Sequence, residues 1–294
     1  MSNLLSIGHG YSARVLGRML VARGWQVTGT SRAAVGFGAD ATRGLVWPGD
    51  DLGLALAEAT HLLISVAPDA DGDPVLRALG DAIGGAAGHL QWVGYLSTTG
   101  VYGDHGGGWV DETTPLTPTT RRGRWRVAAE AEWRALAEAS ALPLHVFRLA
   151  GIYGPGRGPF EKVRKGTARR IVKPGQVFSR IHVEDIAQVL AASMARPDPG
   201  AVYNLCDDDP APPEAVIEEA ARLLGLPVPP AEDFESAAMS EMARSFYAES
   251  KRVRNDRIKT GLGIRLKYPD YRTGLRALLE ADSGRPHGDG GSSH

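Results

Sequence analysis

The sequence predicts an α/β protein built on a doubly wound parallel sheet, with a smaller carboxyl-terminal lobe. Three observations favour this class. Short apolar runs alternate with helix-like patterns through the first half of the chain, as repeated βαβ units do. A glycine-rich turn separates the first apolar run from the first helical pattern. Beyond about residue 151 the alternation weakens, and Pro and Gly become frequent.

The predicted elements begin with a strand over residues 4–7. Apolar residues then recur at helical spacing over 15–20, until Gly24 ends the helix. Five further apolar runs are short enough to be buried parallel strands. These runs are QVTGTS, GLVWP, HLLISVA, HLQWVGYLS and LPLHVFRLA, and a helix around residues 124–139 lies between the last two.

This pattern divides the chain into two domains and a tail. Residues 1–150 form the predicted dinucleotide-binding Rossmann domain, and 151–281 form mainly the smaller lobe. Part of 177–208 could return to the first domain. Residues 282–294 are rich in Gly, Ser and Asp and offer nothing to bury, so we expect a flexible tail.

Composition excludes several classes of partner. The formal net charge of -1 gives no global field to attract nucleic acid or an anionic membrane. The single cysteine and scattered histidines argue against disulfides and a metal cluster. No run approaches the ~20 apolar residues of a membrane span, and the amino terminus lacks the basic region of a signal peptide. We therefore expect a cytoplasmic protein that binds a small molecule, with no metal, nucleic acid or membrane.

The segment GHGYSA matches G-x-G-x-x-G/A between the first strand and the first helix. Such a turn brings the backbone close to a pyrophosphate, and the helix amino terminus adds N–H donors. The alternative is a tight turn that binds nothing. Val66 and Ala67, the last two residues of HLLISVA, are further candidates. The cofactor-binding candidates from these two segments are Gly8, Gly10, Tyr11, Ser12, Ala13, Val66 and Ala67.

The end of the second strand bears on cofactor choice. An NAD site usually carries an acidic residue about twenty residues after the glycine motif, where it binds the ribose 2′-hydroxyl. This chain has Thr30, Ser31 and Arg32 instead. Hydroxyls and a guanidinium can hold a 2′-phosphate, so NADP(H) is favoured over NAD(H). The alternative is that Arg32 is only a solvated charge.

Four further segments support a family resemblance. They are YLSTTGVYG, RLAGIYGPG, the stretch KGTARRIVKPGQVFSRIHVEDIAQVL, and YNLCDD. With these four segments and GHGYSA in this order, the chain resembles the extended short-chain dehydrogenase/reductase superfamily. Within that superfamily it resembles the NAD-dependent epimerase/dehydratase group. The resemblance implies a Rossmann domain for the cofactor and a smaller carboxyl-terminal lobe for the substrate.

In that family a Ser/Thr and a Tyr-x-x-x-Lys pair carry the chemistry, and Thr98 stands at the hydroxyl position. Glu130 resembles a glutamate that often follows the lysine by four residues. Counting back from it places Arg126 at the lysine position and Arg122 at the tyrosine position. Arginine stays protonated and cannot relay a proton as a phenol does. We expect Thr98 and Arg126 to contact the cofactor or substrate; the alternative is an exposed i, i+4 row that only supports the helix.

The expected substrate side lies beyond residue 151. Arg157, Arg169 or Arg180 could hold a phosphate or carboxylate there, although basic runs are more often solvated surface. Tyr102 and Tyr153, in the VYG and IYG segments, are placed beside the substrate without an acid–base role.

The sequence allows two interpretations of the helix around residues 124–139 and three hypotheses about activity. A homodimer could form through the helix that carries Trp125, Ala128, Ala129 and Trp133, or the same pattern could face the sheet. The leading hypothesis is an NADP(H)-dependent oxidoreductase or epimerase-like enzyme for a small polar, nucleotide- or phosphate-bearing substrate. A non-catalytic NADP(H)-binding sensor or scaffold comes second, because the Tyr and Lys are missing. Sugar-nucleotide binding without redox chemistry comes last.

Overall fold

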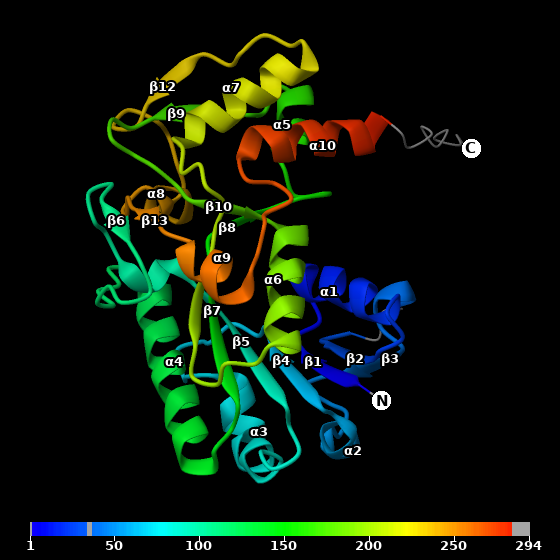
Figure 1. The fold of residues 1–294 in the computed structure, drawn as a ribbon. Coiled ribbons are helices and arrows are strands. Elements are labelled where there is room, and N and C mark those ends of the chain that lie inside the picture. The colour runs from blue at the N-terminus through cyan, green and yellow to red at the C-terminus, as the bar shows by residue number, and fades with distance from the viewer. Residues whose placement is uncertain (1, 34–36, 284–294) are drawn as a thin grey trace.

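The computed structural model describes residues 2–33 and 37–283, and it contains a seven-stranded parallel sheet (Figure 1). The strand order is β11-β7-β5-β4-β1-β2-β3, and every neighbouring pair is parallel. The predicted doubly wound fold is therefore confirmed. The strands are β1 (Asn3–Ile7), β2 (Gln26–Ser31), β3 (Arg43–Val46), β4 (His61–Ile64), β5 (Trp92–Thr98), β7 (Leu144–Leu149) and β11 (Val202–Leu205).

Helices cover both faces of this sheet, as its buried apolar strands require. On one face α1 (Tyr11–Val21), α6 (Val183–Ala195) and α9 (Asp256–Leu262) bury Leu16, Leu190 and Ile258. On the other face α2 (Gly53–Glu58), α3 (Pro74–Gly85) and α4 (Arg121–Ser140) bury residues such as Ile83 and Trp133. Two separate apolar cores thus hold the strand ends in place.

The strand order reverses at β1. The chain runs outward from β1 to β2 and β3, then crosses back to β4 on the other side of β1. In doubly wound sheets, ligands bind beyond the carboxyl ends of the strands at such a switch point. The turns after β1 and β4 meet there, so the fold brings the two predicted cofactor segments together.

The second lobe has its own small core and lies beyond the carboxyl edge of the sheet (Figure 1). Phe160, Val163, Ala220 and Leu275 pack together within it. Its elements are α5 (Phe160–Arg164), β9 (Arg170–Val172), α7 (Pro213–Leu224), β12 (Ala231–Asp233), α8 (Glu241–Phe246) and α10 (Tyr271–Ser283). Two strand pairs link it to the sheet: β8 (Gly151–Tyr153) with β10 (Arg180–His182), and β6 (Trp109–Val110) with β13 (Arg252–Val253).

The chain passes between the lobes more than once. After β10, helix α6 packs on α1, and β11 forms the edge of the main sheet beside β7. At the carboxyl end, Asp282 and Ser283 belong to α10, and the rest of the expected tail lies outside the described residues.

Helix α4 begins at Arg121, three residues before the expected start. The Thr120 hydroxyl accepts a hydrogen bond from the Gly123 N–H (3.1 Å), which is a standard amino-terminal cap. Arg122 therefore lies in the first helical turn, on the cavity side. Within α4, Ala129 and Trp133 face the sheet and are fully buried.

None of the described helices combines the length and the apolar character that crossing a bilayer requires.

Candidate active site

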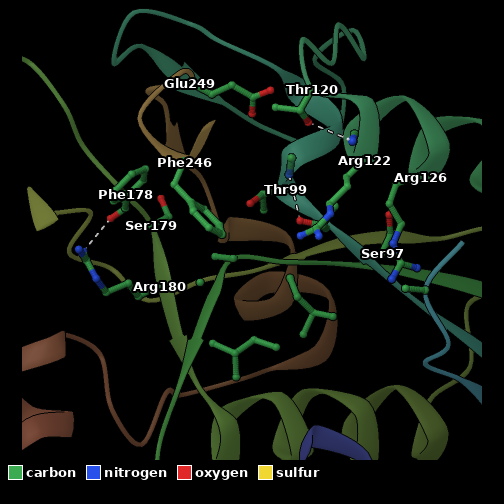
Figure 2. Close-up of a pocket in the computed structure, with 18 of the residues that line it drawn as sticks. Ser97, Thr99, Thr120, Arg122, Arg126, Phe178, Ser179, Arg180, Phe246 and Glu249 are labelled. Atoms are coloured by element: carbon green, nitrogen blue, oxygen red, sulfur yellow. Dashed lines mark hydrogen bonds between the residues drawn. The ribbon is translucent and has the colours of Figure 1, made fainter. Parts of the chain in front are cut away.

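A large cavity lies between the carboxyl edge of the sheet and the second lobe (Figure 2). Its volume is about 1560 Å³, above the roughly 300–1,000 Å³ of most ligand pockets, so it can hold a dinucleotide together with a second small molecule. The turns after β1, β4, β5 and β7, the start of α4, and segments of the second lobe line it. The predicted site residues among its lining are Gly8, Gly10, Tyr11, Ser12, Ala13, Ala67, Thr98, Arg122, Arg126, Tyr153, Arg157 and Arg180.

The glycine turn has the geometry that an anion site needs. Gly8 has φ +82°, and a Cβ on it would lie 2.8 Å from a methyl group of Val66, so the turns after β1 and β4 are in close contact. Gly10 precedes α1, and no described side chain caps the helix. The first-turn N–H groups therefore face the cavity without a side-chain acceptor. This arrangement fits a bound pyrophosphate.

At the end of β2, the side chains of Thr30 and Ser31 do not take the place beside a 2′-phosphate that we expected for them. The Thr30 side chain is buried, and its hydroxyl accepts a hydrogen bond from the Gly8 N–H (2.9 Å). It therefore supports the glycine turn, and Thr30 is not among the residues that line the cavity. The Ser31 hydroxyl donates to the Ala33 carbonyl. Arg32 is exposed, so of these three side chains its guanidinium is best placed to meet a 2′-phosphate.

Arg126 and Arg122 both line the cavity from α4. Arg126 Nη1 donates to the Leu96 carbonyl (2.8 Å) and the Tyr95 hydroxyl (2.9 Å), which anchors the guanidinium at the end of β5. Arg122 is exposed and extends toward the centre of the cavity (Figure 2). Thr98 lines the same cavity, and its hydroxyl accepts a hydrogen bond from the Gly100 N–H (3.1 Å). Two arginines and one hydroxyl thus line the same cavity.

Glu130, one turn after Arg126, is fully buried, so the alternative of an exposed row is wrong at this residue. Its carboxylate accepts hydrogen bonds from Arg148 Nη2 (2.8 Å) and Arg134 Nη2 (2.7 Å), and from the Ser97 hydroxyl. Burial would raise the pKa of Glu130, but the hydrogen bond and charge of Arg148 outweigh it and lower the pKa. The buried pair is therefore ionised.

Tyr102 does not line the cavity, contrary to our expectation. The VYG segment forms the short helix η2 (Thr99–Tyr102), which turns this side chain into the interior. Its hydroxyl donates to Asn204 Oδ1 (2.7 Å) and accepts from Arg148 Nη1 (3.0 Å). Burial raises the pKa of Tyr102 to about 12, so this phenol cannot replace the missing tyrosine.

Tyr153 does line the cavity, but its hydroxyl faces α10. A Cβ on Gly274 would lie 2.1 Å from that oxygen, and the hydroxyl makes no hydrogen bond within the described chain. Burial raises the pKa of Tyr153 far above its ordinary value. Tyr153 therefore contributes an apolar wall and no acid.

The predicted arginines of the second lobe divide into two groups. The Arg157 guanidinium carbon lies 5.7 Å from the centre of the Tyr11 ring, and the Tyr11 hydroxyl donates to the Pro155 carbonyl (3.0 Å). Arg157 therefore lies beside the glycine turn. Arg180 lines the cavity farther into the second lobe. Arg169 instead pairs with Glu232 at the surface, so it holds no ligand in this cavity.

Sequence reasoning missed the residues from the end of α8 to the start of β13. Glu249 and Lys251 form an ion pair (2.8 Å) with side chains only 10% and 11% exposed, and both line the cavity. Phe246 reaches into the same space and is 61% exposed (Figure 2). No local motif marks this segment, because tertiary contacts bring it to the site: β6 pairs with β13, and Lys251 Nζ donates to the Gly103 carbonyl (2.7 Å).

Asp207 lies behind Arg180, and its backbone N–H donates to the Arg180 carbonyl (2.6 Å). The side chain is buried, and neither carboxylate oxygen has a well-formed hydrogen bond in the described chain. Burial raises the pKa of Asp207 to about 8, although the charge of Arg180 opposes the shift. Asp207 is therefore mostly protonated at neutral pH.

Comparison with known proteins identifies the family. A model of the NAD dependent epimerase/dehydratase family matches residues 86–206. Protein YeeZ of Escherichia coli K12 is 31% identical over 287 residues, which cover 92% of this chain and 97% of that protein. The chain therefore belongs to the NAD-dependent epimerase/dehydratase family, as its motifs predicted.

Solved structures share the fold of this chain. A functionally unknown conserved protein from Silicibacter pomeroyi is 64% identical, with a TM-score of 0.90 over 97% of this chain and 100% of that chain. MoeE5, solved with UDP-glucose and NAD, is 21% identical, with a TM-score of 0.77 over 96% of this chain and 99% of that one. Human epimerase family protein SDR39U1, solved with NADPH, is 18% identical, with a TM-score of 0.71 over 95% and 99%. The last two likenesses show the fold.

The Glu130→Gln substitution tests the buried ion pair. It leaves the Arg148 charge buried without its counter-charge, so we expect a loss of about 3–5 kcal/mol in the free energy of unfolding. Arg134→Gln is the matched control, because Arg134 is 41% exposed and bonds the same carboxylate; it should cost at most about 1 kcal/mol. Urea unfolding measures the stability of both variants. Equal small losses would contradict the buried, ionised pair of Glu130 and Arg148.

The Asp207→Asn substitution tests the protonated carboxyl. In the unfolded chain this carboxyl ionises near pH 3.8, and in the folded protein near pH 8. Between these values folding takes up a proton, so the contribution of Asp207 to stability falls as the pH rises. We expect the variant to match the native protein below pH 4 and to exceed it by about 4 kcal/mol at pH 7, at 1.36 kcal/mol per pKa unit.

Urea unfolding of both proteins from pH 4 to pH 8 measures this difference. A difference that does not change with pH would show that Asp207 is ionised in the folded protein.

Proposed function

We propose that this protein is an NADP(H)-dependent oxidoreductase or epimerase-like enzyme that acts on a small polar, phosphate- or carboxylate-bearing substrate. One observation carries the proposal: a single cavity joins the glycine turn of α1 to Thr98 and to the arginines of α4 and of the second lobe. On this proposal, the site of hydride transfer and a basic substrate pocket would share one space. Proteins of the same fold were solved with NAD and with NADPH, which supports the same class of ligand.

The chain offers a distinct group of residues to each part of the cofactor. The N–H groups of residues 10–13 would hold the pyrophosphate, with Arg157 beside them. Arg32, at the end of β2, would meet a 2′-phosphate. Thr98 and Arg126 would lie at the nicotinamide end, at the carboxyl edge of β5. When bound, the cofactor supplies hydride transfer.

The side chains near Thr98 suit a reaction in which negative charge develops on a substrate oxygen. The Thr98 hydroxyl can donate a hydrogen bond to such an oxygen, and Arg122 supplies a fixed positive charge from α4. Neither Arg122 nor Arg126 can give up its proton at ordinary pH. These residues therefore orient the substrate and stabilise its charge, without the proton relay that a tyrosine would provide.

A second candidate is a non-catalytic NADP(H)-binding sensor or scaffold. It is favoured by the arginines at both dyad positions and by the burial of Tyr102 and Tyr153, which leaves no phenol to replace the missing one among these candidates. A sensor should discriminate strongly between NADP+ and NADPH and should not oxidise NADPH with any compound. An enzyme should oxidise NADPH with at least one phosphate- or carboxylate-bearing carbonyl compound.

Calorimetric titration with NADP+, NADPH, NAD+ and NADH tests the cofactor assignment. We expect the phosphorylated forms to bind more tightly, and Arg32→Ala to weaken them about tenfold or more, because a charge-assisted hydrogen bond is lost. NAD(H) binding should be unchanged in this variant. Arg23→Ala, which removes an exposed arginine near the end of α1, is the matched control and should have no effect.

Failure of all four dinucleotides to bind would contradict the proposal. Equal weakening of NADP(H) and NAD(H) in Arg32→Ala would contradict the role of Arg32 alone.

A further inference from the structure

Phe246, the last residue of α8, leaves an aromatic ring exposed inside the candidate active site. The residue is 61% exposed, and in Figure 2 its ring points into the cavity, with Phe178 to one side and Thr99 to the other. The neighbouring Tyr247 contacts the rings of Phe178 and Phe234, with centroids 5.9 and 5.2 Å apart. Phe246 makes no comparable ring contact among the described residues. A ligand that covers this ring would remove apolar surface from water, which favours binding.

Two hydrogen bonds just beyond Phe246 fix the segment that follows the ring. The Ser250 N–H donates to Asp104 Oδ1 (2.7 Å), and Gln176 Nε2 donates to the Glu249 carbonyl (2.7 Å). None of the described residues of α8 is buried, so this helix lies at the surface and presents its last side chain to the cavity. Because the backbone after Phe246 is already fixed, a ligand that contacts the ring has less of the chain to order on binding.

The cavity has two chemically distinct parts. Toward the carboxyl edge of the sheet it offers the Thr98 hydroxyl and the guanidinium groups of Arg122 and Arg126. The second lobe supplies, besides Phe246, a group of apolar and aromatic side chains, which are Val177, Phe178, Val216, Tyr247, Tyr271 and Leu275. A ligand that fills both parts therefore has a polar end and an apolar end.

The polar groups around these apolar side chains are already hydrogen-bonded within the chain. Phe178 and Ala211 exchange N–H···O bonds in both directions (3.1 and 3.0 Å). The Val177 N–H donates to the Ser250 hydroxyl (3.1 Å). Arg180 Nη1 donates to the Phe178 and Ala211 carbonyls, both at 2.9 Å. A nucleobase would bring polar edge groups that leave water for few partners here, which costs free energy, whereas a ring without such groups loses no hydrogen bond.

We propose that Phe246 stacks on an aryl ring of the substrate, a flat aromatic ring with few polar groups on its edge, while the polar end of the substrate lies toward Thr98 and the arginines of α4. This inference rests on the proposed function and adds the apolar end of its substrate. Offset stacking of two rings and the loss of exposed apolar area both stabilise such a complex.

Calorimetric titration of the NADP+-saturated protein tests the proposal. The four ligands are benzoate, cinnamate, crotonate and uridine 5′-monophosphate. Cinnamate and crotonate carry the same unsaturated carboxylate, but crotonate has a methyl group in place of the ring. We expect an aryl carboxylate to bind at least tenfold more tightly than crotonate, and more tightly than the nucleotide, because only the aryl ring covers Phe246 without losing hydrogen bonds.

The Phe246→Ala substitution should weaken the binding of the aryl carboxylates about tenfold and leave the binding of crotonate unchanged. Phe246→Leu keeps an apolar side chain without a ring, so it should recover only part of the loss if stacking contributes. Phe246 is 61% exposed, so neither variant should change the melting temperature. The matched control is Trp109→Ala, which removes an aromatic residue that is 57% exposed and does not line this cavity; it should bind all four ligands as the native protein does.

Three results would overturn the proposal. These are a native protein that binds neither aryl carboxylate, tighter binding of uridine 5′-monophosphate than of both aryl carboxylates, and aryl binding that Phe246→Ala leaves unchanged. Cofactor binding is measured first, so a failure of the proposed function is seen separately. If no dinucleotide binds, the same titrations are run on the cofactor-free protein, where loss of aryl binding in Phe246→Ala still supports the stacking and unchanged binding still overturns it.

Discussion

The ion pair between Glu130 and Arg148 is the constraint on which the candidate site depends. It joins α4 to β7, and the Ser97 hydroxyl extends it to β5. Through Tyr102 the same network reaches Asn204 on β11. Because a helix repeats every 3.6 residues, fixing Glu130 also fixes the residues four and eight positions earlier on the same face. Those residues are Arg126 and Arg122, so the buried carboxylate orients the helix that carries both arginines to the cavity.

The cavity is lined by more basic than acidic side chains. Most of this positive charge comes from arginines, which stay protonated at ordinary pH, and Tyr102 and Tyr153 are buried with raised pKa values. The arginines can therefore attract and orient an anion, and neither Tyr102 nor Tyr153 is suited to relay a proton. An anionic substrate would suit both the positively charged wall and the arginines at the dyad positions.

The local patterns of the sequence were enough for the fold and the glycine turn. Apolar runs and the G-x-G-x-x-A spacing depend on neighbours along the chain, and they placed β1, α1 and the residues that face the cavity. Thr98 and Arg126 followed from the family motif. Side-chain direction did not follow, because it depends on distant contacts: Thr30 turns to Gly8, Tyr102 turns to Asn204, and Arg169 turns outward to Glu232. The Glu249–Lys251 pair reaches the cavity only through tertiary pairing.

A crystal structure of the NADPH complex would show whether one cavity holds both the cofactor and a basic substrate pocket. We expect density for the pyrophosphate at the amino terminus of α1 and for the nicotinamide beside Thr98, with Arg126 still bonded to the Leu96 carbonyl. We also expect Arg180 to remain open to the space next to the nicotinamide. Cofactor density outside this cavity, or a nicotinamide directed away from Thr98 and the second lobe, would contradict the shared cavity.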